Sequence, residues 1–323
     1  MNSSKLEQRD YTLDALKGVG IILMIIGHVP SPIRNLIFSF HMPLFFFISG
    51  YLYKDRPVHD ILIRNTKKVL LPYLITCIFI WSILIIWKHN WRWGLSILLA
   101  NGTDTVWNFS GLMVGPLWFL ACFFVATLGF HFILKLKERY NQVILLLSLW
   151  VVVFLIKRSF GLQPMSILNS VPAMCCLLMG YSANEESVKK YVFSRPAIAV
   201  GIIIWIVCLF YGNVSMAGLT YKLWILQLVG AYYIVFVLFK LLKMLVLIRG
   251  GQFIAQIGRL SLVILCVHSV DYMLNISSSI VLLWNMPNVI VIPLNMLLKL
   301  IFAFTGVIII KQIPLLRRVF AIK

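Results

Sequence analysis

Charge is scarce in this chain of 323 residues, and negative charge is scarcest, because only ten aspartate and glutamate residues occur. Charged residues make up 12% of the sequence, roughly half the usual fraction in soluble domains. Hydrophobic residues make up 61%, and no polar stretch is longer than about thirty residues. These shortages exclude a soluble domain of ordinary size and indicate an integral membrane protein.

Metal-binding patterns and processing signals are also missing. The six cysteines all fall within apolar stretches, and none has metal-ligand spacing with a histidine, so we interpret them as small buried apolar residues. The apolar stretch 18–27 has the length of a signal-peptide core, but charged residues and His28 bracket it, and residues 29–32 offer no small-residue cleavage site. Internal repeats of the kind that build many transporter folds are absent as well. We therefore expect one integral-membrane domain over residues 1–323, with no appended soluble domain and no bound metal.

What the sequence has in abundance is apolar runs of about twenty residues, each long enough to cross a bilayer as a helix. These runs predict an all-α polytopic protein with about ten transmembrane helices in one bundle. The predicted spans are 12–29, 33–53, 69–88, 115–135, 142–157, 166–183, 196–212, 219–239, 253–275 and 289–310.

Basic residues are distributed unevenly between the segments that join these spans. With the N-terminus inside, 21 lysines and arginines fall in inside segments and 6 in outside segments. This asymmetry predicts that both termini face the cytoplasm. The net charge of +19 thus follows from membrane topology, and we do not interpret it as a sign of nucleic-acid binding.

Three ionisable residues share one stripe of the first predicted helix. Lys17 and His28 are eleven residues apart, which is roughly three turns and roughly 16 Å of rise, so they face the same way. Asp14 lies one turn before Lys17 on the same face. Ionisable groups at membrane depth are costly and usually functional, so this stripe predicts proton chemistry or movement of a charged group.

Two further histidines in predicted spans have polar neighbours that suggest a function. His41 lies in the second span, which a short turn joins to the first, and Pro43 is expected to kink this helix. We expect the imidazoles of His28 and His41 to approach each other. In the ninth span His268 has Asp271 as a face neighbour, so the carboxylate could orient the imidazole. Ser261 is on the same face, but roughly 10 Å away, too far for a direct hydrogen bond. A structural polar cluster explains these ninth-span residues equally well.

Four motifs resemble the acyltransferase-3 family of integral-membrane acyltransferases. A basic residue, ten intervening residues and a histidine form the first motif, here Lys17 to His28. Ser39-Phe40-His41-Met42-Pro43 is similar to the family's second helix, and most like the subgroup of fucose 4-O-acetylase-like enzymes. Residues 116–120, Pro-Leu-Trp-Phe-Leu, and residues 257–268, with their late Gly-x-x-Ser and His, complete the resemblance. The sequence departs from the family where Lys17 replaces a frequent arginine and where Leu265-Cys266 replaces an aromatic-rich segment.

The resemblance implies a multi-pass O-acetyltransferase of the plasma membrane. Acetyl-CoA would be the cytoplasmic donor, and a hydroxyl of a surface polysaccharide or its lipid-linked precursor would be the acceptor. In this hypothesis His28 acts as general base or acyl carrier, Lys17 holds the donor, and Asp14 orients Lys17. The expected substrate-binding residues are His41, Ser39, Trp118, Ser261 and His268.

Two other functions fit the same residues. Buried charges can also form the proton relay of a saccharide exporter or flippase. An acetylase of a small cytoplasmic molecule would share the fold and the donor and differ only in the acceptor.

Overall fold

The computed structural model describes residues 11–103, 111–160, 164–211, 214–245, 249–282 and 286–322. In this part of the chain helices account for nearly all regular structure. The first half contains α1 (Tyr11–Gly27), α2 (Arg34–Phe38), α3 (His41–Tyr51), α4 (Val58–Asn65), the π-helical turn Thr66–Leu70, α5 (Leu71–Lys88), the 3₁₀ turn Trp91–Trp93, α6 (Gly94–Leu99), the 3₁₀ turn Gly115–Leu117, α7 (Trp118–Ile133) and α8 (Arg139–Phe160). The second half contains the 3₁₀ turn Pro164–Ser166, α9 (Ile167–Ser182), α10 (Glu186–Val192), α11 (Arg195–Tyr211), β1 (Val214–Ser215), β2 (Thr220–Tyr221), α12 (Ile225–Leu245), α13 (Arg249–Arg259), α14 (Ser261–Leu274), α15 (Ile276–Leu282), α16 (Asn288–Gln312) and α17 (Pro314–Val319).

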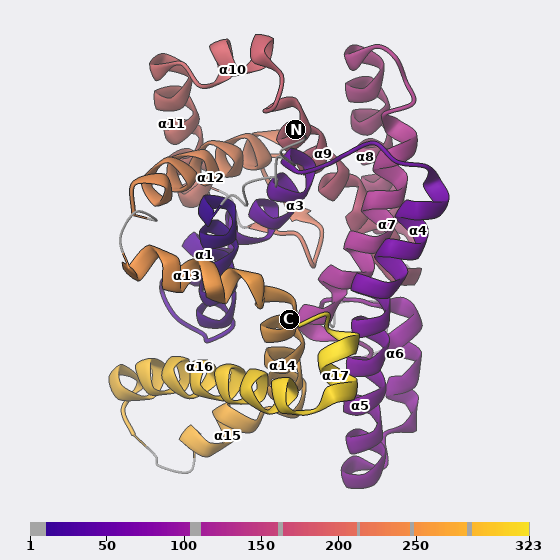
Figure 1. Cartoon of the computed structure of the whole chain (residues 1–323), viewed down its shortest axis with the longest axis vertical. Coiled ribbons are helices and arrows are strands. Elements are labelled where there is room, and N and C mark those ends of the chain that lie inside the picture. The colour runs from indigo at the N-terminus through magenta and orange to yellow at the C-terminus, as the bar shows by residue number, and fades with distance from the viewer. Residues whose placement is uncertain are drawn as a thin grey trace, which may run out of the picture.

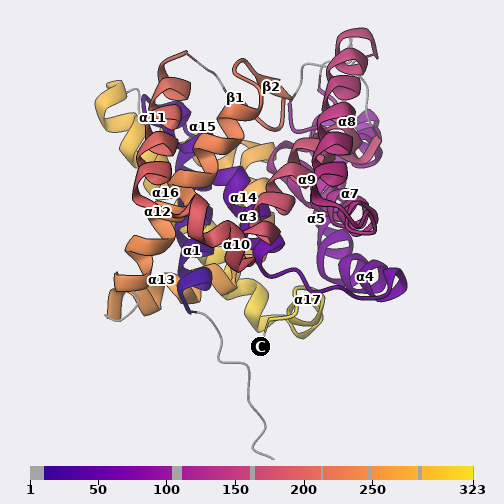
Figure 2. The ribbon, with the colours of Figure 1, turned by 90° about the horizontal axis from the view of Figure 1, so that it is seen from above.

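α14 is largely buried and contacts α1, α5 and α16, and α1 contacts α3, α12 and α13 as well. Figure 1 shows α1, α12 and α13 on one side of the molecule and α4, α5, α7 and α8 on the other. In the view of Figure 2, β1, β2 and α15 lie toward one end, and α4, α13 and α17 lie toward the opposite end. The predicted topology, with both termini facing the cytoplasm, stays a prediction.

The structure confirms a multi-pass helical protein without confirming the number of spans. Within the described residues, five helices are long and apolar enough to cross a membrane, and seven are if two bent pairs each count as one span. The bent pairs are α10 with α11, at 67°, and α13 with α14, at 70°. The first predicted span corresponds to α1, which has 17 residues and is not among these helices, each of which has at least 18 residues. The number of ten membrane spans stays a prediction.

Three predicted spans differ from the structure. The second span breaks between α2 and α3, ahead of the proline that was expected to kink it. Pro43 lies in the first turn of α3, where a missing N–H is harmless, and its ring is incompatible with a continuous helix through the carbonyl four residues earlier. The ninth span breaks at Leu260, between α13 and α14. The eighth begins only at Ile225, because residues 214–221 form a hairpin instead.

Glycines allow α1 and α13 to pack with their backbones almost in contact. A Cβ added at Gly258 would lie 1.7 Å from the carbonyl oxygen of Asp14, and one added at Gly18 would lie 2.1 Å from that of Ile254. Small residues of this kind are typical of close helix pairs in membranes. The consequence for the site is that Arg259, next to Gly258, is held beside the start of α1.

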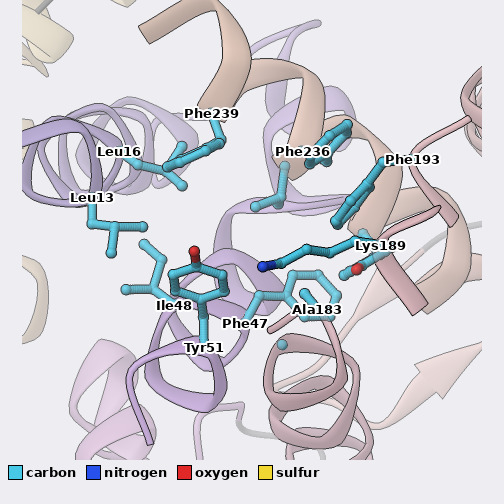
Figure 3. A pocket seen from close by; sticks show the side chains of 13 residues that line it. Leu13, Leu16, Phe47, Ile48, Tyr51, Ala183, Lys189, Phe193, Phe236 and Phe239 are labelled. Atoms are coloured by element: carbon cyan, nitrogen blue, oxygen red, sulfur yellow. The ribbon is translucent and has the colours of Figure 1, made fainter. Parts of the chain in front are cut away.

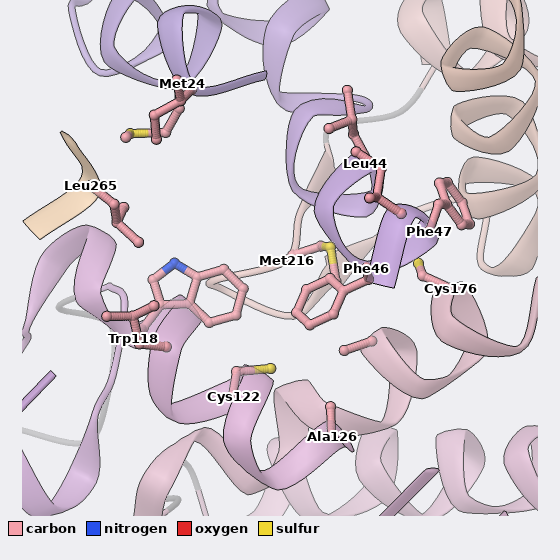
Figure 4. Packing of buried hydrophobic residues seen from close by; sticks show 14 of the residues in the cluster. Met24, Leu44, Phe46, Phe47, Trp118, Cys122, Ala126, Cys176, Met216 and Leu265 are labelled. Atoms are coloured by element: carbon pink, nitrogen blue, oxygen red, sulfur yellow. The ribbon is translucent and has the colours of Figure 1, made fainter. Parts of the chain in front are cut away.

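The buried core joins α1, α3, α7 and α14. Figure 4 shows the indole of Trp118 surrounded by Met24, Leu265 and Met216, which come from α1, α14 and the hairpin. Trp118 is only 4% exposed. All six cysteines are free and buried, as the sequence predicted.

Candidate functional site

His28 lies immediately after the last residue of α1, and its ring is fixed by one hydrogen bond. Its Nδ1 is 2.7 Å from the carbonyl oxygen of Met24, which can only accept, so Nδ1 carries the proton. The lone pair of the neutral imidazole is then on Nε2. The rings of His268 and Tyr272 both lie 5.1 Å from the His28 ring, between centroids. This histidine therefore has a defined tautomer and a defined orientation.

His28 lines two cavities. The first, called here the large cavity, measures about 640 Å³ and lies between the end of α1, the start of α2, and α14, α15 and α16. The second, the small cavity, measures about 50 Å³ and is lined by His28, His41 and Trp118 among others. The imidazole thus lies at the boundary between a space large enough for a ligand and a narrow internal space.

His28 and His41 share the small cavity without direct ring contact. Phe38 lies between them, with ring centroids 5.7 Å from His28 and 5.0 Å from His41. His41 is fixed in the same way as His28, because its Nδ1 is 3.0 Å from the carbonyl oxygen of Ile37. The rings nearest to His28 are instead those of His268 and Tyr272, and the sequence predicted neither contact.

The hairpin β1–β2 closes the small cavity. Residues 214–217 line it, and the side-chain amide of Asn169, buried in α9, donates to the carbonyl oxygens of Met216 and Ala217. This polar contact holds the turn of the hairpin against α9.

The two serines predicted to bind substrate do not line these cavities. The indole N–H of Trp205 donates to Ser39 Oγ at 2.9 Å, which connects α11 to the end of α2. Ser261 is the first residue of α14, two turns before His268. In the structure Ser39 makes a contact between helices, and Ser261 begins a helix.

Asp271 does not orient His268, so the expectation that its carboxylate bonds to the imidazole is wrong. The Asp271 carboxylate accepts from the backbone N–H and hydroxyl of Ser277, each at 2.7 Å, and from the Lys299 ammonium at 2.9 Å. Both groups of the ion pair are almost fully buried. Both ring nitrogens of His268 are buried and have no hydrogen-bond partner among the described residues. The Asp271 carboxylate is bound by Lys299 and Ser277, and it therefore makes no hydrogen bond to the imidazole of His268, one turn away.

The chain geometry around Asp271 explains why Ser277 is available. Asn275 ends α14 in the left-handed conformation, with φ at 56°, which asparagine tolerates better than most residues. The chain then reverses into α15, so that Ser277 returns to the carboxylate. The same reversal places Asn275 and Ser278 on the wall of the large cavity.

The opposite end of α1 carries a second cluster of charges. The Asp14 carboxylate lies 3.7 Å from Lys17 Nζ and 3.2 Å from Arg259 Nε. The guanidinium of Arg259 also covers the ring of Tyr11, 5.1 Å from its centroid. Two cations therefore lie beside one carboxylate at this end of α1.

An apolar pocket of about 230 Å³ lies near this end, next to Leu13 and Leu16 of α1. Figure 3 shows its aromatic lining, including Phe47 and Phe193, with the Lys189 side chain extending among the rings. Lys189 pairs with Glu186 at 2.7 Å, so the cation among the described lining residues already has a partner.

Three residues near the site were not predicted as functional from the sequence. Lys299 had a clear signal, because a lysine in the middle of an apolar run is rare. Arg259 was counted only as a basic residue of an inside segment. Tyr272 gave no signal in the sequence, and its position depends on Gly115, where an added Cβ would lie 2.7 Å from the tyrosine ring.

Comparisons with known proteins agree with these observations. A family model described as an acyltransferase domain matches residues 10–312. The nodulation protein NolL of Mesorhizobium japonicum is 27% identical over 161 residues, covering 45% of this chain and 39% of that protein. The nodulation protein NolL of Sinorhizobium fredii is 31% identical over 162 residues, covering 46% and 41%. The match thus spans about two fifths of the length of these relatives, and no solved structure matches the chain.

Proposed function

This chain belongs to the acyltransferase family whose model covers residues 10–312, and on that premise we propose that it is a membrane O-acetyltransferase of the plasma membrane. The donor in this proposal is cytoplasmic acetyl-CoA, and the acceptor is a hydroxyl of a cell-surface polysaccharide or its lipid-linked precursor. The observation that supports it best is the position of His28, whose tautomer is fixed and whose ring lines the large cavity.

The proposed chemistry uses the free lone pair of His28. Nε2 removes the proton of the acceptor hydroxyl as its oxygen attacks the carbonyl carbon of the thioester. The carbon–sulfur bond then breaks, and the imidazolium returns the proton to the departing thiolate. The Nδ1–H bond to Met24 holds the ring in the tautomer that this exchange needs.

The donor is proposed to bind at the other end of α1. Lys17 and Arg259 both lie beside Asp14, and side chains of these two types are the usual partners of phosphate groups such as those of CoA. Lys17 and His28 are separated by roughly 16 Å along the helix. The phosphates at Lys17 and the thioester near His28 would then belong to one elongated donor molecule.

The direct test uses purified protein in detergent with acetyl-CoA labelled in the acetyl group and lipid-linked saccharides extracted from host membranes. We expect label to move to the saccharide as an oxygen ester, which alkaline hydroxylamine releases, while neutral hydroxylamine cleaves only the thioester of unused donor. Extract without the protein is the control. If label stays on CoA, but the same protein moves saccharide across sealed vesicles, the chain is a transporter and the proposal is wrong.

His268 gives a prediction that separates function from stability. A buried polar group without a partner costs ~1–3 kcal/mol, so its replacement by an apolar residue removes that cost. We expect His268→Leu to leave the midpoint of thermal unfolding unchanged or raised, while acetyl transfer falls because the ring beside His28 is lost. Unfolding and transfer are measured on the same preparation. A lowered midpoint with normal transfer per folded molecule would identify His268 as a structural residue.

A further inference from the structure

The large cavity is lined by polar and apolar side chains together, and its size is in the usual range for small-ligand sites. Its wall is built from the ends of α1 and α14, the start of α2, and α15 and α16. Side chains with polar groups on this wall include those of His28, Arg34, Tyr272, Asn275, Ser278 and Asn295.

The amides and hydroxyl of this wall match the groups of a saccharide. Asn275, Asn288 and Asn295 each carry both donors and an acceptor, and sugar hydroxyls need both. Asn295 Nδ2 lies 3.2 Å from Ser278 Oγ, which fixes one of these amides toward its neighbour. The Tyr272 ring, beside His28, offers an apolar face on the same wall. A sugar ring bound here would have a hydroxyl near the imidazole.

The charge of the wall is positive. Aspartate and glutamate are absent among its described residues, and two cations are present, Arg34 and Lys299. Lys299 is neutralised by Asp271. Arg34 forms no ion pair within the described part of the chain, and its guanidinium is placed over the Phe38 ring, 4.9 Å from the centroid. The wall therefore has one positioned cation without a counter-charge.

We propose that the large cavity binds an acceptor saccharide that carries an anionic group, a carboxylate or a phosphate, and that Arg34 binds this group. The proposal rests on the proposed function in treating the cavity as the acceptor site. An arginine presents a rigid fork of donors that matches both anions, and hydrogen bonds to charged groups are among the strong ones. Arg34 thus selects the acceptor, while His28 acts on its hydroxyl.

The test measures binding of model acceptors to the whole protein in nanodiscs, without acetyl-CoA. The probes are octyl β-glucoside, octyl β-glucuronide and octyl β-glucoside 6-phosphate, which differ only in the group at C6. We expect at least one anionic probe to bind about 10-fold more tightly than the neutral probe, or better, as a charge-assisted hydrogen bond implies. The probe with the larger preference identifies carboxylate or phosphate as the natural group.

Variants assign the preference to Arg34. Arg34→Gln is expected to remove the anionic preference, and Arg34→Lys to retain part of it. Arg92→Gln is the matched control, because Arg92 is also exposed and also lies against an aromatic ring, that of Trp91, but does not line the cavity. The Arg92→Gln variant should prefer the anionic probes over the neutral probe as strongly as the unchanged protein does. Equal binding of all three probes, or a preference that persists in Arg34→Gln, overturns the proposal.

Binding without donor keeps this test separate from the acetyl-transfer test. An anionic preference that depends on Arg34 supports the inference even if no acetyl group is ever transferred. Acetyl transfer to saccharides without any anionic preference supports the proposed function and contradicts the inference. The midpoint of thermal unfolding of each variant, measured in the same nanodiscs, confirms that the fold is intact.

Discussion

Replacing His28 with alanine is expected to reduce acetyl transfer by ~10²–10⁴-fold, the usual cost of losing a general base. The side chain is fixed by Met24 and lines the large cavity, and its removal leaves the described lining residues without an imidazole to take the proton. The measurement is the rate of label transfer from acetyl-CoA in detergent, at equal amounts of folded protein. His28→Gln keeps a polar side chain but no titratable nitrogen, and it should be impaired as strongly.

The matched control for this experiment is His59→Ala. His59 lies on α4, and 76% of its side chain is exposed, so the substitution removes an imidazole far from any buried contact. We expect transfer by this variant to equal that of the unchanged protein. Normal transfer by His28→Ala would contradict the proposed role of His28, whatever the control shows.

The largest effect on stability is expected at the ion pair of Lys299 with Asp271. Lys299→Met leaves the Asp271 carboxylate buried without its cation, and breaking a buried pair in this way typically costs ~3–5 kcal/mol. The carboxylate also holds Ser277, so the turn from α14 into α15 should loosen as well. The measurement is the midpoint of thermal unfolding in detergent, which we expect to fall clearly.

A second substitution tests whether the loss comes from the unpaired charge. In Lys299→Met with Asp271→Asn the charge is gone, while the asparagine carbonyl still accepts from Ser277, so most of the stability should return. Lys311→Met is the control for removing a lysine from α16, because Lys311 is exposed near the end of that helix. A double variant as unstable as Lys299→Met would show that packing, and not charge, stabilises this position.

Local patterns in the sequence were sufficient for the parts of the site that belong to one helix. Asp14 and Lys17 are three residues apart, and the structure has them paired on α1, because helical spacing alone determines which side chains are neighbours. The position of His28 at the far end of the same helix follows from the same geometry. Hydrophobic runs likewise identified the helices of the membrane domain, since backbone groups in lipid must be bonded within the helix.

The sequence could not show which of several possible partners a polar side chain binds in the folded protein. Helical spacing suggested Asp271 as the partner of His268, but Lys299, 28 residues later, takes the carboxylate. The hairpin at 214–221 was missed for the same reason, because the side-chain amide of Asn169, more than 40 residues earlier, holds its turn.

The sequence by itself determined that this protein is helical, lies in a membrane and carries a polar stripe along its first helix. Those properties depend on composition and on spacing within one segment, and both can be counted along the chain. Only the tertiary structure decided that His28 lies against His268, that Arg259 joins Asp14, and that Arg34 faces the large cavity. These contacts form when helices that are remote in sequence pack together, and small residues such as Gly258 determine how closely they approach.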